Sequence, residues 1–378
     1  MQAEQRGDDG LWLAARCELG LQRPVAGTFA AHGVHYLPAR QVNDGDQFHG
    51  MRVFVYEHVT GGGFAGEALP ASLASEGELM LRALLDDLRD VPGTEVLLLR
   101  DARLPPLDPS MQALRPHSPQ EADALFRRSC LAADAVWPIA PETGGTLERL
   151  SSQALDCGRV LLGCRPEAVR IAASKTMTAR ALARAGVPVA PAYNDAAQLP
   201  AHIVEVVIKP DDGAGCLDTR LHDRASALEW WRRNDHRNHV LQPYLRGEAL
   251  SLSLLCDGRS VHLLTCNRQH IAIEEGVFHF KGVSVNAVRG DRERYARLGR
   301  HIAAAIPGLW GYVGVDLIET EQGAVVLEVN PRLTTSYVGL RRALACNPAR
   351  LVLALLEPVS MDFEAPDDAA VNVETCYG

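Results

Sequence analysis

The chain has 378 residues, of which 47% are hydrophobic and 22% charged, and its formal net charge is −9. This composition suits a globular protein of two or three domains and excludes a chain that is disordered throughout. The acidic balance and the lack of a dense lysine and arginine run argue against nucleic acid as the main partner. No apolar stretch could span a bilayer and the N-terminus does not resemble a signal peptide, so we expect a cytoplasmic protein.

Residues 1–50 show no sustained period of 2 or 3.6, and we expect an irregular extension there. Residues 51–63 read MRVFVYEHVTGGG, where four apolar or aromatic residues, 53–56, lead to three glycines. This pattern predicts a buried parallel strand followed by a loop with exposed backbone. A strand that begins at an internal methionine favours translation from Met51, and a natural extension packed on the surface is the alternative.

Helices and strands alternate from residue 51 to residue 165. Apolar residues recur at helical spacing over 72–89, and Ser72 or Ser75 would cap this helix. The further predicted elements are strands at 95–99, 135–140 and 159–162 and helices that begin at Glu121 and after Gly145. Alternation of this kind predicts a doubly wound α/β domain whose ligand-binding groups gather at the carboxyl ends of its strands.

The pattern changes after residue 165 to that of an α+β region with an antiparallel sheet. The predicted helices are one that carries Lys175, one at 291–305 and others near 347–356. The predicted strands lie at 204–210, within 239–258 and 261–282, and at 311–320 and 323–332. We expect two lobes here, at about 166–240 and 241–378.

Three oxygen-bearing side chains are predicted to share one face of the last strand pair. Glu328 and Asn330 are two residues apart on one strand, and Asp316 lies on its partner. Carboxylate and amide oxygens suit Mg²⁺. Exposed polar positions would be the ordinary alternative, but apolar residues flank both carboxylates, so a nearby cation is needed to offset their desolvation.

Lys209 ends a β-branched strand and precedes a loop that contains Gly213 and Gly215. Glycines let backbone N–H groups approach phosphate oxygens, and a lysine at a strand end supplies a point charge for them. Many strands end in Lys-Pro, and a lysine on a helix, such as Lys175, is usually solvated. Each signal is therefore weak when taken alone.

Taken in order, Lys175, VIKPDDGAG, LQPYLRGEALSLS, Asp316 and LEVNPR resemble the ATP-grasp superfamily over roughly residues 166–350. The resemblance implies a pre-ATP-grasp α/β domain at 51–165 followed by a two-lobed ATP-grasp domain at 166–378. It also implies that ATP binds between the lobes with Mg²⁺, or with Mn²⁺ as the alternative ion.

The resemblance also implies individual contacts. Its nucleotide-binding positions correspond here to Lys175, Lys209, Asp212, Gly213, Gly215, Gln242, Tyr244, Leu245 and Glu248, and its metal ligands to Asp316, Glu328 and Asn330. Glu248 would hold the ribose, although the residue that the family places between the glycine and this acid is missing. Pro243 stands where the family often has glutamate, which the main-chain adenine contacts tolerate.

Three segments, 54–77, 266–271 and 330–340, resemble the tyramine–glutamate ligases of methanofuran biosynthesis and their bacterial relatives. By this likeness Glu57 or Glu76 would bind the substrate amine, and a helix-start charge is the alternative for each. Arg268 and Arg332 would bind the carboxylate or the transferred phosphoryl group. Apolar residues surround Arg268 in its predicted strand, so we expect a buried anion beside it.

Other candidate side chains receive plainer interpretations. His58, His270 and His279 are interpreted as structural, although a role for His270 in the site stays open. Lys281 could belong to the surface or to the site. The nine cysteines contain no Cys-x-x-Cys pair, which argues against a zinc site or a disulfide framework.

The function that the resemblance implies is an ATP-dependent ligase that forms an amide through an acyl phosphate, with Lys209, Arg268 and Arg332 as catalytic groups. It would join glutamate to tyramine, tyrosine or a related aromatic amine. The alternatives are another ATP-grasp amino-acid ligase, an ATP-grasp carboxylase, and a nucleotide-binding regulator without turnover. We expect small-molecule partners, without nucleic acid or membrane, and leave a homo-oligomer open.

Overall fold

The computed structural model describes residues 50–108, 112–213, 215–357 and 370–375. The described residues lie within one compact unit. Of the predicted extension at 1–50, only Gly50 is described, so the prediction for that segment lies outside the described residues.

A parallel sheet forms the first part of the described chain, with strand order β2-β1-β3-β4. Its strands are β1 (Met51–Glu57), β2 (Thr94–Leu98), β3 (Ala135–Ile139) and β4 (Val160–Leu161). All its strand pairings are parallel, which confirms the predicted α/β class for this part of the chain. The run Val53–Val55 is fully buried, as expected for a strand covered on both faces.

Helices connect these strands. They are the π-helix η1 (Val59–Gly63), α1 (Ala71–Arg89), α2 (Pro119–Ala132), the short 3-10 helix η2 (Thr143–Gly145) and α3 (Thr146–Asp156). Ser118 caps α2 by accepting a hydrogen bond from the N–H of Glu121 at 3.2 Å. The predicted serine cap of α1 is wrong, because Pro70 is its N-cap residue and no side chain caps it.

The single helix predicted around Lys175 is two helices, α4 (Pro166–Ala173) and α5 (Lys175–Arg184). Ser174 separates them with extended backbone angles, and its hydroxyl accepts a hydrogen bond from the N–H of Met177 at 3.0 Å. The break places Lys175 at the first residue of α5.

A larger antiparallel sheet follows, with strand order β12-β11-β8-β9-β10-β6-β5-β7 and β13 paired to β10. Its strands are β5 (Glu205–Pro210), β6 (Arg220–Asp223), β7 (His239–Pro243), β8 (Glu248–Cys256), β9 (Val261–Glu274), β10 (Val277–Val285), β11 (Gly311–Thr320), β12 (Gly323–Asn330) and β13 (Val371–Glu374). The predicted antiparallel sheet is therefore confirmed. Strands β6 and β13 and the helix α6 were not predicted from the sequence.

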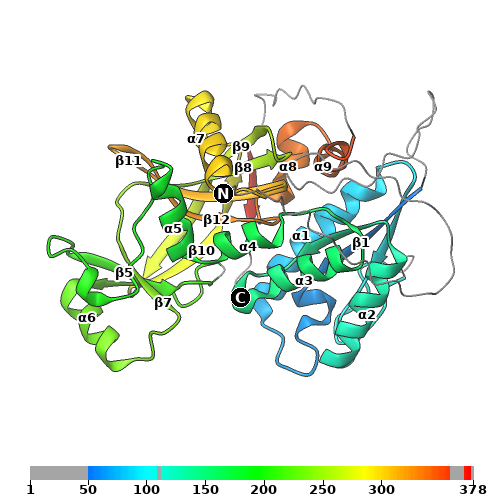
Figure 1. Ribbon diagram of the computed structural model, residues 1–378, viewed down its shortest axis with the longest axis horizontal. Helices are drawn as coiled ribbons and strands as arrows, with labels where there is room; N and C mark the ends of the chain where they lie inside the picture. Colours follow the sequence, from blue (N-terminus) through cyan, green and yellow to red (C-terminus); the bar gives the residue numbers. More distant parts are fainter. Residues whose placement is uncertain (1–49, 109–111, 214, 358–369, 376–378) are drawn as a thin grey trace, which may run out of the picture. The chain divides into compact units, whose positions relative to one another are not determined.

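Helices cover parts of this sheet. They are η3 (Ala196–Gln198), α6 (Arg224–Arg233), α7 (Arg292–Ala305), α8 (Tyr337–Leu344) and α9 (Pro348–Ala354). Figure 1 shows α6 beside β5 and β7, and α7 packs on β8 and β9. Gly299 permits the close approach of α7, since a Cβ there would lie 3.0 Å from the Leu254 side chain.

A buried carboxylate joins α1 to the helices that follow β12. The hydroxyl of Tyr337 donates to Asp87 Oδ2 at 2.9 Å, and Arg341 Nη1 donates to Oδ1 at 3.3 Å. The side-chain amide of Asn347 donates to the Asp87 carbonyl at 2.7 Å. These bonds tie the helix beside the parallel sheet to α8 and to the start of α9.

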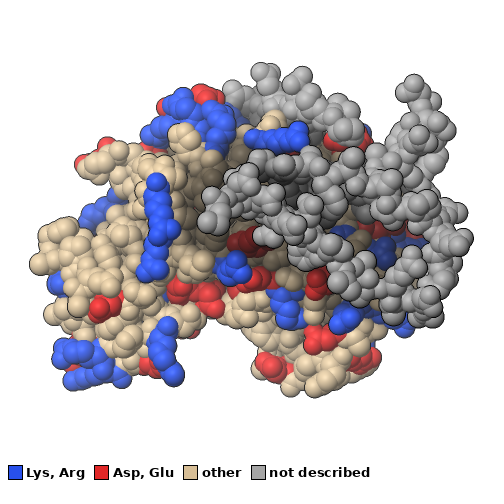
Figure 2. Space-filling model, in the orientation of Figure 1, with Lys and Arg blue, Asp and Glu red and all other residues tan. Residues whose placement is uncertain are grey.

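The surface charges and the cysteines of the described residues show ordinary features. On the face shown in Figure 2, lysine and arginine side chains form separate small groups with acidic side chains nearby. Among the described residues, no helix has the length and apolar character needed to cross a membrane. All the cysteines described by the structure are free thiols.

Candidate nucleotide and metal site

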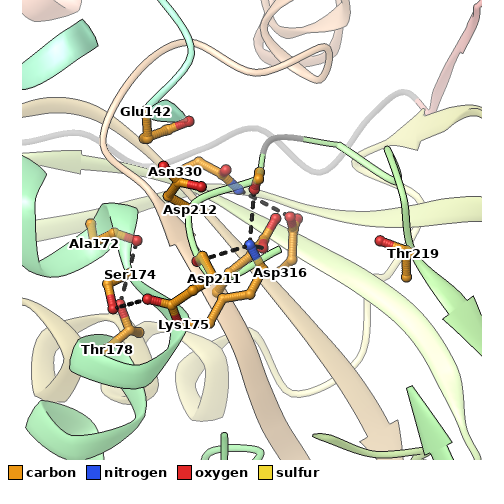
Figure 3. Close-up of polar contacts among 12 residues, drawn as sticks. Glu142, Ala172, Ser174, Lys175, Thr178, Asp211, Asp212, Thr219, Asp316 and Asn330 are labelled. Carbon is orange, nitrogen blue, oxygen red and sulfur yellow. Dashed lines mark hydrogen bonds and ion pairs between the residues drawn. The ribbon is translucent and has the colours of Figure 1, made fainter. Parts of the chain in front are cut away.

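The strand pair β11–β12 brings the three predicted metal ligands together. Asp316 lies directly opposite Glu328 in the register. The Asn330 amide donates to Asp316 Oδ2 at 3.0 Å (Figure 3). Gln269 Nε2 donates to Asp316 Oδ1 at 2.8 Å. Because the amide nitrogen of Asn330 bonds to Asp316, its amide oxygen is the atom available as a ligand.

The pKa values of the two carboxylates shift in opposite directions. Burial raises the pKa of Asp316, and the neighbouring charge of Glu328 raises it further. Burial also acts to raise the pKa of Glu328, but the ammonium groups of Lys175 and Lys209 outweigh it and lower that pKa. Facing carboxylates repel each other when both are ionised, and a cation between them removes this penalty.

These side chains therefore fit Mg²⁺, which prefers one or two carboxylates together with phosphate oxygens and water. Among the described residues, no cluster contains three or more histidine, cysteine or acidic ligands. A metal bound here would thus depend on two carboxylates, an amide and oxygens from the nucleotide.

Two buried lysines face this cluster. Lys175 Nζ lies 3.2 Å from Glu328 Oε2 and donates to the Gly213 carbonyl at 2.9 Å. Burial lowers the pKa of Lys209 to about 8. Among the described residues, the Lys209 ammonium has no hydrogen-bond or ion-pair partner. An unpaired buried ammonium beside a paired one suits an anion such as phosphate.

The glycine-rich loop follows β5. A Cβ at Gly213 would lie 2.9 Å from the Pro210 side chain, and Gly215 has a φ of +65°, so both positions favour glycine. Asp212, predicted to contact the nucleotide, instead accepts hydrogen bonds from the Gly144 N–H at 2.9 Å and from Asn238 Nδ2 at 2.6 Å. Its carboxylate therefore fastens the loop to η2 rather than facing the lysines.

The connection between β7 and β8 contains the predicted adenine contacts. The Gln242 side chain is buried and donates to the Ala190 carbonyl at 3.4 Å. Tyr244 and Leu245 are half-buried, and the Tyr244 N–H donates to the Glu205 carbonyl at 3.0 Å. The role of these residues in binding adenine stays a prediction.

Arg268 does not have the buried surroundings predicted for it. Its side chain is 48% exposed and forms an ion pair with Glu248, the predicted ribose ligand, which is 43% exposed. Arg268 and Gln269 are neighbours in a regular part of β9, so their side chains point to opposite faces of the sheet. Since Gln269 contacts Asp316, Arg268 lies on the face away from the metal-ligand cluster, and this position does not support the predicted catalytic role.

Arg332 follows β12 by two residues and lies near the cluster. Its Nε lies 3.0 Å from Glu142 Oε1, and its Nη2 donates to Oε2 at 3.0 Å. Burial alone would lower the pKa of Arg332, but the carboxylates of Glu142, Glu76 and Glu328 raise it. Glu142 was not predicted as a site residue, because the pairing joins positions 190 residues apart.

Glu57 and Glu76, the two predicted amine ligands, differ in their surroundings. Glu57 is buried and accepts hydrogen bonds from the Thr60 N–H and hydroxyl, both at 2.6 Å, and from the Val59 N–H at 3.2 Å. These bonds satisfy the first N–H groups of η1 and give Glu57 a structural role, and its contact with the substrate amine stays a prediction. Glu76 is half-buried on α1, and its carboxylate acts to raise the pKa of Arg332.

The remaining candidates have local partners. His58 lies 3.4 Å from the Tyr56 hydroxyl, and His270 Nε2 lies 2.8 Å from the Ser284 hydroxyl. Lys281 forms an ion pair with Glu274 at 3.4 Å. Its side chain is about half exposed, so it lies on the surface.

Comparison with known proteins gives concordant results. The model of the ATP-grasp domain matches residues 172–336, and that of the pre-ATP-grasp domain matches residues 94–169. Two proteins named tyramine–L-glutamate ligase are similar over 294 residues and 76% of this chain. The one from Methanocaldococcus jannaschii is 26% identical over 84% of its length, and the one from Methanocaldococcus fervens is 25% identical over 89%.

Solved structures share the fold. A protein from Archaeoglobus fulgidus assigned to the ATP-grasp superfamily has a TM-score of 0.62 and 25% identity, covering 80% of this chain and 88% of its own. The L-amino acid ligase from Bacillus licheniformis has a TM-score of 0.63 and 17% identity, covering 83% of this chain and 76% of its own. The chain therefore belongs to the ATP-grasp superfamily, with a pre-ATP-grasp domain before its ATP-grasp domain, and is an enzyme of the ligase family.

Proposed function

We propose that the chain joins a carboxylate to an amine in two steps. The carboxylate attacks the γ-phosphorus of ATP, which yields an acyl phosphate and ADP. The amine then attacks the acyl carbon, an amide forms, inorganic phosphate leaves, and the amine nitrogen loses a proton. The observation that carries this proposal is the buried Lys209, which has no bonded partner among the described residues, beside the Lys175–Glu328–Asp316 cluster.

Each side chain of the cluster has a task in this reaction. Lys175 and Lys209 bind and orient the phosphates, and their charges offset negative charge that moves during transfer. Asp316, Glu328 and Asn330 would hold Mg²⁺, which supplies charge neutralisation at the phosphate oxygens. The glycine-rich loop after β5 would keep water away from the acyl phosphate.

The proposed substrates are glutamate and tyramine, tyrosine or a related aromatic amine, in a pathway that resembles methanofuran biosynthesis. The support is the similarity to the two tyramine–L-glutamate ligases. Arg332 is the candidate for a glutamate carboxylate, and Glu76 for the ammonium group of the amine. The carboxylate of Glu76 acts to raise the pKa of Arg332, so charges of both signs lie near the cluster.

The test incubates the purified protein with MgATP, glutamate and each amine in turn, and follows ADP release and the product mass. ADP release that requires both substrates, with a product of the expected amide mass, would support the proposal. ADP release with an unrelated acid and amine would overturn the substrates and leave the ligation reaction standing. ATP binding without turnover across a panel of amino acids and amines would overturn the reaction itself.

A further inference from the structure

Asp211 bonds to Ser174, Lys175 and Thr176 at the start of α5, and Figure 3 shows its bond to Ser174. Its Oδ2 accepts a hydrogen bond from the Ser174 hydroxyl at 2.6 Å. Its Oδ1 accepts from the Thr176 N–H at 2.8 Å and from the Thr176 hydroxyl at 2.9 Å. The Asp211 carbonyl accepts from the Lys175 N–H at 3.0 Å. One residue thus holds the backbone from which the Lys175 side chain extends.

The bond to Ser174 also organises the helix cap. A hydroxyl has one proton to donate, and Ser174 gives it to Asp211 while accepting from the Met177 N–H at 3.0 Å. The direction of the Ser174 hydroxyl is therefore set by Asp211. A carboxylate near a helix N-terminus also interacts favourably with the helix dipole.

The same residue is tied to the strand that carries the second lysine. Asp211 follows Lys209 by two residues at the end of β5, and its N–H donates to the Asn238 carbonyl at 2.9 Å. Two residues further along, the Gly213 carbonyl accepts from Lys175 Nζ. Asp211 consequently links the two elements that present the phosphate-binding lysines, although it is not itself directed at the phosphates.

We propose that Asp211 is a positioning residue that sets the placement of Lys175 relative to Lys209 and the glycine-rich loop. The proposal rests on the proposed ATP-dependent reaction. Without Asp211 the start of α5 loses three side-chain hydrogen bonds, and Lys175 loses its fixed separation from Lys209. Misplacement of a charged group by about 1 Å can lower a rate by about 100-fold.

The test compares Asp211→Ala, Asp211→Asn and the matched control Asp223→Ala. Asp223 caps α6 with the same pattern, accepting from the Ser226 N–H at 3.0 Å and the Ser226 hydroxyl at 2.6 Å. We expect Asp211→Ala to lower kcat/KM for ATP by about 10- to 100-fold. Asp211→Asn should restore most of it, because its amide can still bond to both partners. Asp223→Ala should leave activity unchanged.

A double-mutant cycle shows whether Asp211 acts through Lys175. In a Lys175→Ala background, the further loss from Asp211→Ala should nearly vanish, since the group being positioned is gone. A full, additive loss in that background would overturn the proposal, as would equal losses for Asp211→Ala and Asp223→Ala. If Asp211→Ala does not fold, Thr176→Val removes one of the donors and should show a smaller loss of the same kind.

ATP binding measured by calorimetry separates this inference from the proposed reaction. If the wild-type protein binds ATP but ligates nothing, the proposed function fails, and the affinities of the variants still test the positioning role. Weaker ATP binding by Asp211→Ala, recovered in Asp211→Asn, would support the inference without any turnover. Equal ATP affinities for these variants and the wild type would overturn it.

Discussion

Asp87 and Asp316 are both buried carboxylates, and burial raises the pKa of each. Asp87 receives its hydrogen bonds from a hydroxyl and a guanidinium group, on Tyr337 and Arg341. Asp316 receives its bonds from two neutral amides and faces a second carboxylate, Glu328. The protein thus supplies a cation to the first carboxylate and opposes the second with a like charge.

This difference separates a carboxylate that joins two helices from one that is proposed to bind a metal ion. Around Asp87 the bonds join α1 to α8, so changes there should alter stability. Repulsion between Asp316 and Glu328 destabilises the folded protein, and binding of a cation between them relieves it. Sites of this kind commonly sacrifice stability for activity. Substitutions around Asp87 should therefore change stability and leave turnover unchanged, whereas substitutions around Asp316 should chiefly lower turnover.

The largest effect should come from Glu328→Gln. This change removes a proposed metal ligand and the partner of Lys175, so we expect ADP release to fall by at least about 100-fold. ATP affinity should change much less, because the missing charge matters most as the phosphoryl group moves. Stability should stay close to the wild-type value, since repulsion of Asp316 is removed as well. Initial-rate kinetics and thermal melting would measure both.

Glu319→Gln is the matched control for that substitution. Glu319 lies on β11 and is bonded to Arg294 at 2.7 Å and to the Tyr295 hydroxyl at 2.9 Å, away from the proposed ligands. It should keep wild-type turnover. Wild-type turnover in Glu328→Gln would contradict the assignment of a functional role to the cluster.

The next effect concerns Lys209→Met. Replacing a buried ammonium by an apolar chain of similar length should raise the melting temperature, because the cost of burying the charge outweighs its attraction to Glu328 and Asp316. ATP turnover should fall by about 10- to 100-fold because a phosphate contact is lost. A lower melting temperature with unchanged turnover would indicate that Lys209 belongs with the structural group.

The sequence predicted the functional cluster better than its surroundings. Alternation along two paired strands was enough to bring Asp316, Glu328 and Asn330 together, because residues two apart share a face. The resemblance to ATP-grasp proteins added the lysines. The break at Ser174 was missed because apolar helical spacing continues on both sides of it, although serine is a preferred N-cap residue.

The errors concern features that depend on partners far along the chain. The face on which Arg268 lies follows from the register of β9 with β8 and β10, which the local pattern does not contain. The bonds of Glu57 are instead local, because η1 turns the Thr60 N–H back toward its carboxylate. The pairing of Arg332 with Glu142 required the two sheets to be brought together, which no spacing rule predicts.

A smaller effect should appear in the pH dependence of stability. Burial raises the pKa of Asp87 from 3.8 to about 6, so the folded state binds this proton more tightly than the unfolded state. The contribution of Asp87 to stability is therefore present at low pH and is lost as the pH rises through about 6. The melting temperature of Asp87→Asn, relative to the wild type, should become higher as the pH increases from about 4 to about 7.

Asp90→Asn is the control for this pH dependence. Asp90 is about half exposed and also bonds to Arg341. The substitution therefore removes a carboxylate from the same guanidinium group, but that carboxylate is not buried. Because the Asp90 carboxylate is exposed, this variant should not reproduce the pH trend expected of Asp87→Asn. A parallel pH dependence for Asp87→Asn and the wild type would show that Asp87 does not titrate differently in the folded protein. ADP release should be unaffected in both variants.

The smallest effect should come from Tyr337→Phe, which removes one hydroxyl and leaves the ring packed against Tyr312. The loss of this hydrogen bond should lower the free energy of unfolding by about 1 kcal/mol, with unchanged ADP release. Because the hydroxyl donates a hydrogen bond to Asp87, its removal should matter less in an Asp87→Asn background, where no ionised acceptor remains.

Urea denaturation of the two single variants and the double variant would measure this coupling. If the two losses simply add, the hydroxyl of Tyr337 and Asp87 contribute independently, and the junction between α1 and α8 is held by packing instead. A loss of ADP release in Tyr337→Phe would show that the structural and functional groups are coupled, against the division drawn from their bonding partners.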